Sequence, residues 1–326
     1  MQEEVDILLT VYNTETKYLK QQIESILNQT YKNFRLLISD DASTKKEVKT
    51  TLEEYQKQDN RITLYKQEKN LGYNKNFEFL LKQANAKYIM FADHDDVWYP
   101  QKIEKSLQKI KEEEVDLVYC NAHQINEKGE IIQQNYFRYK NVPLIHGKDK
   151  LAISRCIGIG CSQIITDDVK NKMIPFTKEV IAHDWLAAFL ANEGKGIAYI
   201  KQALFGYRLH TNNVFGGRSL AQNLRQWKKE KGTSYASYLQ YRKEKVIDTA
   251  YLEGANMCLA YATKEENRKF IEKLIKYYNS LQKSKYINIH IFLYFKFLAG
   301  RNLAKKMIKE WMIFHLPVLG YLIFMI

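Results

Sequence analysis

Two hydrophobic periods alternate through the first 120 residues. Short apolar runs rich in β-branched residues predict buried strands at 5–12, 34–39, 62–67, 87–92 and 115–120. Between these runs apolar residues recur at helical spacing, which predicts helices over 19–27, 45–58, 77–84 and 103–110. This alternation is typical of an α/β fold with a mostly parallel sheet whose two faces are covered by helices.

The pattern loosens after residue 121. Residues 123–134 predict a hairpin around Lys128-Gly129, and 150–215 mix short apolar runs with glycines. From about residue 218 the sequence is helical in pattern and rich in lysine and tyrosine. We therefore expect a boundary near Gly216-Gly217. It separates a domain at 1–217, with halves 1–120 and 121–217, from a helical C-terminal region at 218–326.

Three carboxylates crowd the end of the predicted strand 87–92. Asp93, Asp95 and Asp96 lie in one short segment, 93–96, which we call the acidic loop. Like charges this close repel unless a cation lies among them. In extended geometry Asp93 and Asp95 point to the same side, at the strand end where such sheets bind ligands. The pair predicts a site for Mg²⁺ or Mn²⁺, completed by substrate phosphates and waters.

The helix that follows offers a simpler explanation for these acids. Asp95 or Asp96 could cap that helix, since aspartate is a favoured N-cap residue. Pro100 fits the first helical turn, however, which places the cap at Tyr99.

Two further strand ends carry side chains that suit a nucleobase. ISDDAS (38–43) places Asp40 and Asp41 after the second strand, and LLTVYN (8–13) ends the first strand with Tyr12. An aspartate can accept from the N3–H of uracil or thymine, and a tyrosine can stack on the ring. Because parallel strands end at one edge, these loops and the acidic loop predict a nucleotide pocket. An Asx turn is the alternative for the two aspartates.

Four stretches, in this order and spacing, carry a family resemblance. They are TVYN (10–13), QTYKNFRLLISDDAS (29–43), NLGYNKNFE (70–78) and DHDDVWYPQK (93–102). Together they resemble the successive motifs of inverting family 2 glycosyltransferases with the Rossmann-like GT-A fold, over about the first 120 residues. The resemblance implies a nucleoside diphosphate sugar bound by this first half. It also implies that Tyr12 and Asp40 contact the base, while Asp93 and Asp95 hold ribose and metal.

The second half adds two elements to the resemblance. AHDWLAAFLA (182–191) and YRLHTNNVFGG (207–217) resemble the HDW and YRxHxxN elements of a rhamnosyltransferase-like subset. The resemblance implies that Asp184 is the catalytic base that takes the proton of the acceptor hydroxyl. The donor-binding set it implies is Thr10, Tyr12, Asn13, Asp40, Asp41, Asn70, Asn76, Asp93, Arg208 and His210.

Acceptor contacts are harder to assign, because little of 123–181 matches the family. GIGCS (158–162) resembles a small-residue loop that faces the acceptor, and a close-packed turn explains it equally well. Asp184 could instead cap a helix, His183 could pack in the core, and Arg208 could form a surface ion pair. The acceptor-contact candidates are Gly160, Cys161, His183 and Trp185.

Charge changes the picture only in the last third of the chain. The 326 residues carry a formal charge of +13, and residues 218–326 hold 20 Lys and Arg against 8 Asp and Glu. As a helix the apolar stretch 311–326 would be about 24 Å long, short of the roughly 30 Å hydrocarbon core. We therefore expect it to attach to an anionic membrane surface rather than span the bilayer. A helical subdomain or a homo-oligomer interface is the alternative.

These observations combine into one functional hypothesis. The four cysteines have no framework spacing and the N-terminus has no signal-peptide pattern, which favours a reducing compartment. We expect a metal-dependent, inverting transferase, peripheral at the cytoplasmic face of the plasma membrane. The donor would be dTDP-L-rhamnose, with a UDP-hexose as the alternative. The acceptor would be a polyprenyl-linked glycan of a cell-wall or capsular polysaccharide.

Other classes of protein fit the sequence less well. A phosphohydrolase with an aspartyl nucleophile needs its paired aspartates on an early strand, whereas Asp93 and Asp95 follow the fourth. A nucleic-acid binder would need basic and aromatic residues on one face, and the long uncharged runs of the tail argue against it. A scaffold without catalysis would not need the intact Asp93, Asp95 and Asp184.

Overall fold

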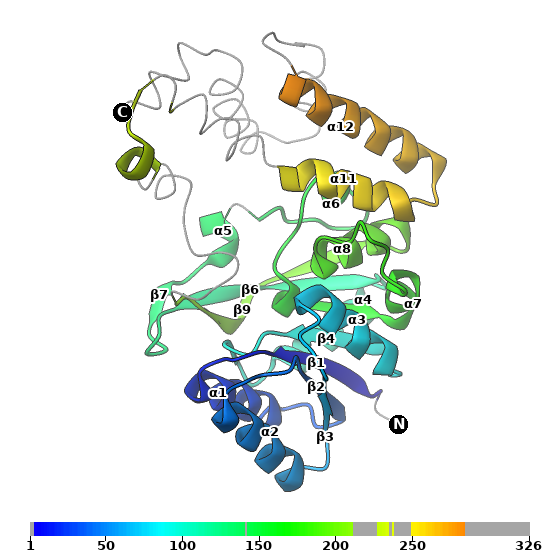
Figure 1. Ribbon diagram of the computed structural model, residues 1–326. Coiled ribbons are helices and arrows are strands. Elements are labelled where there is room, and N and C mark those ends of the chain that lie inside the picture. Colours follow the sequence, from blue (N-terminus) through cyan, green and yellow to red (C-terminus); the bar gives the residue numbers. More distant parts are fainter. Residues whose placement is uncertain (1–2, 141, 211–226, 235–236, 238–248, 284–326) are drawn as a thin grey trace.

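A mixed β-sheet covered by helices forms the body of the protein (Figure 1). The computed structural model describes residues 3–140, 142–210, 227–234, 237 and 249–283. The strands are β1 (Val5–Val11), β2 (Phe34–Asp40), β3 (Ile62–Lys66), β4 (Tyr88–Ala92), β5 (Val97–Trp98), β6 (Leu117–Ile125), β7 (Ile131–Gln133), β8 (Gln163–Thr166) and β9 (Ile197–Arg208). The helices are α1 (Thr16–Leu27), α2 (Lys46–Gln58), α3 (Tyr73–Gln83), α4 (Lys102–Glu112), α5 (Tyr136–Lys140), α6 (Leu151–Ser154), the 3₁₀ helix η1 (Gly160–Ser162), α7 (Asp167–Met173), α8 (His183–Glu193), α11 (Thr249–Tyr261) and α12 (Glu265–Lys283).

The first half of the sheet follows the hydrophobic pattern. β3, β2, β1 and β4 lie side by side in that order and are parallel. Every residue of β1 and β4 is buried, which requires packing on both faces of the sheet. Helix α3 packs against β1 and β2, as expected of a crossover helix. The α/β alternation predicted for this half is confirmed.

The second half departs from the prediction of a mostly parallel sheet. β8 lies antiparallel between β4 and β6, and the short β5 pairs antiparallel with β9. β6 and β9 are parallel to each other, so the sheet as a whole is mixed. A buried strand of four residues such as β8 carries no pattern that sets its direction. The predicted hairpin is confirmed, since β6 and β7 pair around the turn at Gly129 (φ 87°).

The start of α4 corrects another expectation. The helix begins at Lys102 with Gln101 as its N-cap residue, so neither Tyr99, Asp95 nor Asp96 is the cap. Two residues before Pro100 the chain instead forms β5, and the main-chain N–H of Tyr99 donates to the carbonyl of Leu204. The strand at β5 has only two residues, too few for a hydrophobic period.

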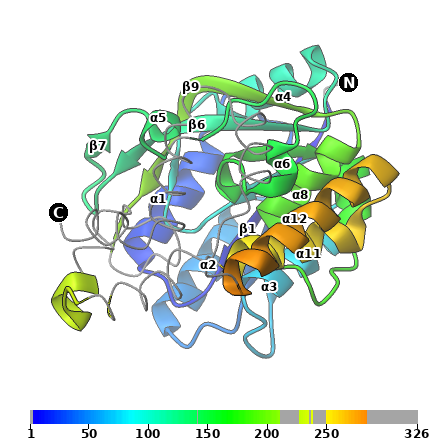
Figure 2. The same ribbon diagram turned by 90° about the horizontal axis from the view of Figure 1, so that it is seen from above.

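A helical hairpin of α11 and α12 packs on α6 and α8 (Figures 1 and 2). The carboxylate of Glu193, at the end of α8, accepts from the main-chain N–H groups of Thr263 and Lys264, each at 3.0 Å. These donors precede α12, whose first amides have no partner inside the helix. Within residues 249–283 the basic region thus forms a helical hairpin that packs on the sheet domain. The boundary expected at Gly216-Gly217 and the stretch 311–326 lie outside the described residues.

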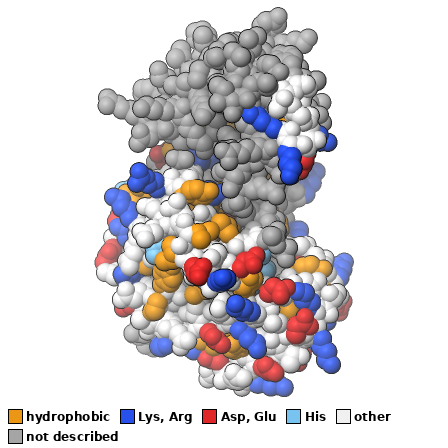
Figure 3. All heavy atoms as spheres, turned by 90° about the vertical axis from the view of Figure 1, so that its left-hand side faces the viewer, with side chains coloured by type: hydrophobic (Ala, Val, Ile, Leu, Met, Phe, Trp, Pro, Cys, Tyr) orange, Lys and Arg blue, Asp and Glu red, His pale blue; other side chains and the backbone are white. Residues whose placement is uncertain are grey.

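The described surface mixes charges of both signs. On the face drawn in Figure 3, acidic and basic side chains are interspersed and apolar side chains gather nearby. Within the described ranges no helix combines the length and apolar character that a bilayer crossing requires.

Candidate functional site

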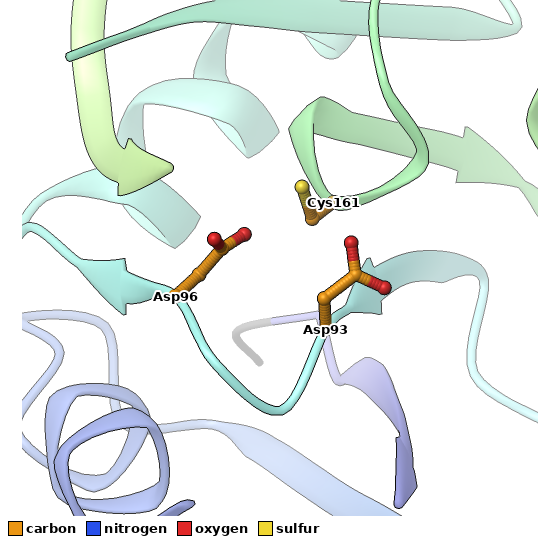
Figure 4. A group of neighbouring side chains, drawn as sticks. All are labelled: Asp93, Asp96 and Cys161. Atoms are coloured by element: carbon orange, nitrogen blue, oxygen red, sulfur yellow. The ribbon is translucent and has the colours of Figure 1, made fainter. Parts of the chain in front are cut away.

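The acidic loop connects β4 to β5 and directs its carboxylates into the protein. Asp96 is fully buried and Asp93 is half-buried. Oxygens of these two carboxylates and the Sγ of Cys161, on η1, all lie within 4.8 Å of one another. Figure 4 shows both carboxylates on the same side of the loop, facing the segment that carries Cys161. Within the described residues, Oδ2 of Asp96 is buried without a hydrogen-bond partner.

The electrostatics of the loop follow from this crowding. Burial raises the pKa of Asp93 to about 6, and the charge of Asp95 adds to the effect. Burial, followed by the charges of Asp95 and Asp93, raises the pKa of Asp96 well above its usual value. Burial would also raise the pKa of Asp95, but a hydrogen bond with His210 and the charge of His94 outweigh it, so that pKa is lowered. A bound cation would relieve the repulsion among the three acids.

The donor set of this cluster fits a hard divalent cation. Oδ2 of Asp96 is buried without a partner among the described residues, and the carboxylates of Asp96 and Asp93 offer the oxygens that Mg²⁺ and Mn²⁺ take. Burial raises the pKa of the Cys161 thiol well above its usual value, so the thiol lines the site as a neutral group. Asp96 is a ligand candidate that the sequence interpretation missed, because its position beside a helix suggested only a cap.

His210 holds the remaining acid of the loop. Its Nε2 lies 2.7 Å from Oδ2 of Asp95, and its ring stacks with Tyr18 at a centroid distance of 5.6 Å. The pair Asp95–His210 places one carboxylate and one imidazole side by side next to Asp93 and Asp96. The metal role predicted for Asp95 stays a prediction, and in the structure this carboxylate bonds to His210.

Arg208 ends β9 and is fully buried, so the surface ion pair considered from the sequence is wrong. Its Nε donates to the carbonyl of Asp95 at 2.7 Å, and its main-chain N–H donates to Oδ1 of Asp96 at 3.1 Å. These contacts fix the backbone of the acidic loop. Contact between Arg208 and the diphosphate of a donor stays a prediction. Further guanidinium contacts join the carbonyls of Asn126 (3.1 Å) and Glu127 (3.2 Å) and Oε1 of Gln21 (2.7 Å).

The aspartates after β2 shape the neighbouring loops. Oδ1 of Asp40 accepts from the N–H of Ser43 at 3.0 Å, so the turn explanation is correct for this residue. Both oxygens of Asp41 accept main-chain N–H groups, from Leu71 at 2.7 Å and Gly72 at 3.0 Å. Asp41 thereby ties the end of β2 to the start of α3. Base contact by Asp40 and donor contact by Asp41 stay predictions.

The other donor-binding candidates lie along the same strand edge. Oδ1 of Asn13 accepts from the N–H of Thr44 at 2.8 Å, just before α2. Tyr12 is 45% exposed, which leaves its ring open to a stacking partner. The buried Asn76 donates to the carbonyl of Ser39 at 3.2 Å. The side chain of Asn70 approaches the carbonyl of Asp41 (3.4 Å), and Nδ1 of His94 lies 3.2 Å from the carbonyl of Thr10.

Asp184 lies in the first turn of α8 and is not its cap. The cap residue is Ala182, so the capping alternative is wrong. Two residues of α3 hold this helix start: the hydroxyl of Tyr73 donates to the carbonyl of Ile181 at 2.6 Å, and the amide of Asn74 donates to the same oxygen at 2.9 Å. The charge of Asp184 is a minor contributor to the raised pKa of Asp93, which burial chiefly causes.

Comparison with known proteins decides the family. The sequence model described as "Glycosyl transferase family 2" matches residues 6–171, half of the chain. This range contains β1 to β8 and the acidic loop. The chain belongs to glycosyl transferase family 2.

Individual relatives of this glycosyltransferase agree with the assignment. It is 28% identical over 227 residues to an uncharacterized glycosyltransferase, MJ1057, of Methanocaldococcus jannaschii, covering 68% of this chain and 76% of the relative. It is 25% identical over 270 residues to the putative teichuronic acid biosynthesis glycosyltransferase TuaG of Bacillus subtilis, covering 81% and 96%. The rhamnosyltransferase-like subset is not distinguished by these relatives.

Solved structures share the fold at low identity. TarS 1–349 of S. aureus, in complex with UDP-GlcNAc, aligns with a TM-score of 0.53 and 16% identity over 85% of this chain and 81% of that chain. The longer TarS chain is covered over 55%. The mannosyltransferase PcManGT of Pyrobaculum calidifontis, in complex with GDP-Man and Mn²⁺, aligns with a TM-score of 0.53 and 13% identity over 87% and 84%. These likenesses show a GT-A-like fold.

Among the acceptor-contact candidates of the glycosyltransferase, His183 and Gly160 pack against each other in the core. His183 is buried between Phe77 and Phe91, with ring centroids 4.1 and 4.8 Å away. In the part of the chain that the structure describes, neither of its ring nitrogens has a hydrogen-bond partner. A Cβ on Gly160 would come within 2.6 Å of its Nε2, so glycine is required there. The core-packing explanation is thus correct for His183.

Trp185, another acceptor-contact candidate, packs against α11. It is buried, and its ring occupies the space that a Cβ on Gly254 of α11 would need. It also lies edge-on to Tyr251 at 6.3 Å. Its packing joins the helical hairpin to α8, and acceptor contact by Trp185 stays a prediction.

We predict that His183 makes the fold sensitive to acid. Burial lowers the pKa of His183, so the folded state resists protonation while the unfolded chain accepts a proton near pH 6.5. Stability is therefore lost as the pH falls through that value, by up to about 2 kcal/mol at pH 5. Denaturant unfolding at pH 7 and pH 5 should show that His183→Phe loses less stability than the wild type. Equal losses in the two proteins would contradict this explanation.

Proposed function

We propose that this glycosyltransferase moves a sugar from a nucleoside diphosphate donor to an acceptor hydroxyl with inversion, using Mg²⁺ or Mn²⁺. The observation that carries the proposal is the cluster of the acidic loop, in which carboxylate oxygens of Asp93 and Asp96 lie within 4.8 Å of each other and Oδ2 of Asp96 is buried without a partner among the described residues. A divalent ion bound there would supply positive charge for the departing diphosphate. The complexes of TarS with UDP-GlcNAc and of PcManGT with GDP-Man and Mn²⁺ support the donor class and the metal.

Asp184 is the base in this proposal. Its carboxylate is half-buried and accepts from the N–H of Trp185 at 2.8 Å through Oδ1. The carboxylate takes the proton of the acceptor hydroxyl as the hydroxyl oxygen attacks the anomeric carbon. The bond from that carbon to the diphosphate oxygen breaks with its electron pair on the diphosphate. Attack from the side opposite the leaving group inverts the anomeric configuration.

The donor we propose is dTDP-L-rhamnose, and a UDP-hexose is the second candidate. The HDW element at 183–185 and the YRLH element at 207–210 support the first. The UDP complexes of TarS favour the second. Both donors present a pyrimidine whose N3–H suits Asp40, and the exposed ring of Tyr12 lies at the same strand edge.

The acceptor we propose is a polyprenyl-linked glycan of a cell-wall or capsular polysaccharide, met at the cytoplasmic face of the plasma membrane. The name of TuaG supports a polysaccharide context, and the apolar stretch 311–326 beside Lys305, Lys306 and Lys309 supports peripheral attachment. A binding protein without catalysis is the contrasting candidate. Mixed charge on the face in Figure 3 differs from the continuous basic stripe that nucleic acid needs.

Replacement of the base should separate chemistry from binding. We expect Asp184→Asn to lower the turnover number by roughly 100- to 10,000-fold, the usual contribution of a general base, with donor affinity unchanged. Asp168→Asn is the matched control, because Asp168 is also the second residue of its helix, α7, and is exposed. Turnover near the wild-type value in Asp184→Asn would remove this residue from the role.

A panel of nucleotide sugars should identify the donor. With Mn²⁺ present, dTDP-L-rhamnose at about 100 times its Kd should stabilise the protein by about 2.7 kcal/mol, seen as a rise in Tm. Asp93→Asn should abolish the rise, because it removes a carboxylate of the cluster. If only UDP-hexoses raise the Tm, the proposed donor is wrong and the proposed enzyme class stands. A lack of response to every nucleotide sugar would count against donor binding itself.

Removal of residues 311–326 tests the membrane proposal. We expect the truncated protein to stay in the supernatant when anionic vesicles are sedimented, while the full chain pellets. Substitution of Lys305, Lys306 and Lys309 by Gln should weaken binding to anionic vesicles and leave the apolar contribution intact. Truncated protein that still pellets at high salt would exclude these residues as the anchor.

A further inference from the structure

A lysine side chain is buried directly behind the acidic loop. Lys102 begins α4 and is fully buried. Its Nζ donates a hydrogen bond to the carbonyl of Cys161, and lies 3.6 Å from the ring centroid of Trp98 and 4.3 Å from that of Phe205. One ammonium group thereby contacts η1, β5 and β9, the three segments that surround the Asp93–Asp96 cluster.

This position is unfavourable for a cation on two grounds. Moving an ammonium group out of water is costly unless charges or dipoles replace the lost hydration. The N-terminus of a helix also carries partial positive charge, so a lysine at the start of α4 meets the unfavourable end of the dipole. An apolar side chain of the same length, such as methionine, would fill the space without either cost. Packing alone does not explain why a lysine occupies this place.

The acidic loop supplies the missing compensation. Burial lowers the pKa of Lys102, and Cys120, Cys161, Asp96 and Asp93 partly oppose this lowering. The carbonyl of Cys161, which accepts from the ammonium, belongs to the residue whose Sγ lies within 4.8 Å of both carboxylates. The rings of Trp98 and Phe205 add cation–π attraction. Lys102 therefore brings a positive charge to the segment that carries Cys161 and faces Asp93 and Asp96.

We propose that Lys102 is a positioning residue for the transfer reaction. Its charge balances Asp93 and Asp96 before a divalent ion binds, and its hydrogen bond to Cys161 fixes the segment Gly160–Ser162 against the acidic loop. That segment holds Gly160 next to His183 and so lies at the start of the helix that carries Asp184. The inference rests on the proposed metal-dependent function, and it predicts opposite effects on metal binding and on turnover.

The test compares Mn²⁺ binding and turnover in the full-length protein. Lys102→Met removes the charge, so we expect Mn²⁺ to bind roughly tenfold more tightly in calorimetry without donor, while donor turnover falls at least about tenfold. Lys102→Arg keeps the charge and should keep the wild-type Mn²⁺ affinity. Lys105→Met is the control on the same helix, because Lys105 bonds to Gln202 at the surface and should change neither quantity.

The outcomes separate this inference from the proposed function. Unchanged or weaker Mn²⁺ binding in a folded Lys102→Met protein overturns the role of Lys102 and leaves the metal site standing. A wild-type protein that binds no Mn²⁺ and transfers no sugar overturns the proposed function, and the inference with it. Loss of folding in both Lys102→Met and Lys102→Gln, with rescue by Lys102→Arg, would make Lys102 a stability residue and also overturn the proposal.

Discussion

The buried guanidinium of Arg208 fixes the acidic loop, and the geometry of the site depends on that contact. Burying a charged group is costly, and the cost is tolerated only where hydrogen bonds replace its hydration. Arg208 meets this condition through main-chain carbonyls on two loops, including that of Asp95, and through the ring of Tyr18 at 4.5 Å. The guanidinium donates to carbonyl oxygens of these loops, so it sets their backbone through contacts that do not use the carboxylates of the acidic loop.

Two cations thus flank the acidic loop in different ways. Arg208 holds its backbone from the end of β9, whereas Lys102 lies behind it and contacts the loop of Cys161. The strand β5, with Trp98 beneath the ammonium of Lys102, joins the two positions.

The sequence predicted the elements that have a clear period and the residues that form motifs. Strands β1 to β4 and their helices agree with the hydrophobic pattern within a few residues, and the acidic loop lies where its three aspartates indicated. The antiparallel β8, the short β5 and η1 were not predicted, because each is too short to show a hydrophobic periodicity. The structural roles of Lys102 and Arg208 were also missed, since residue type indicates the surface and only tertiary structure shows that both are buried.

The crowding of carboxylates gives the loop a reason to be rigid before any ligand arrives. Three acids held together by a mobile backbone would separate, and the energy of their repulsion would be lost. With the backbone fixed by Arg208, the acids stay close in the folded state, where burial first and the neighbouring carboxylate charges second raise the pKa values of Asp93 and Asp96. A divalent ion would then gain the relief of that repulsion on binding without ordering the loop. Rigidity and excess negative charge therefore act together, and neither alone would make this loop an effective cation site.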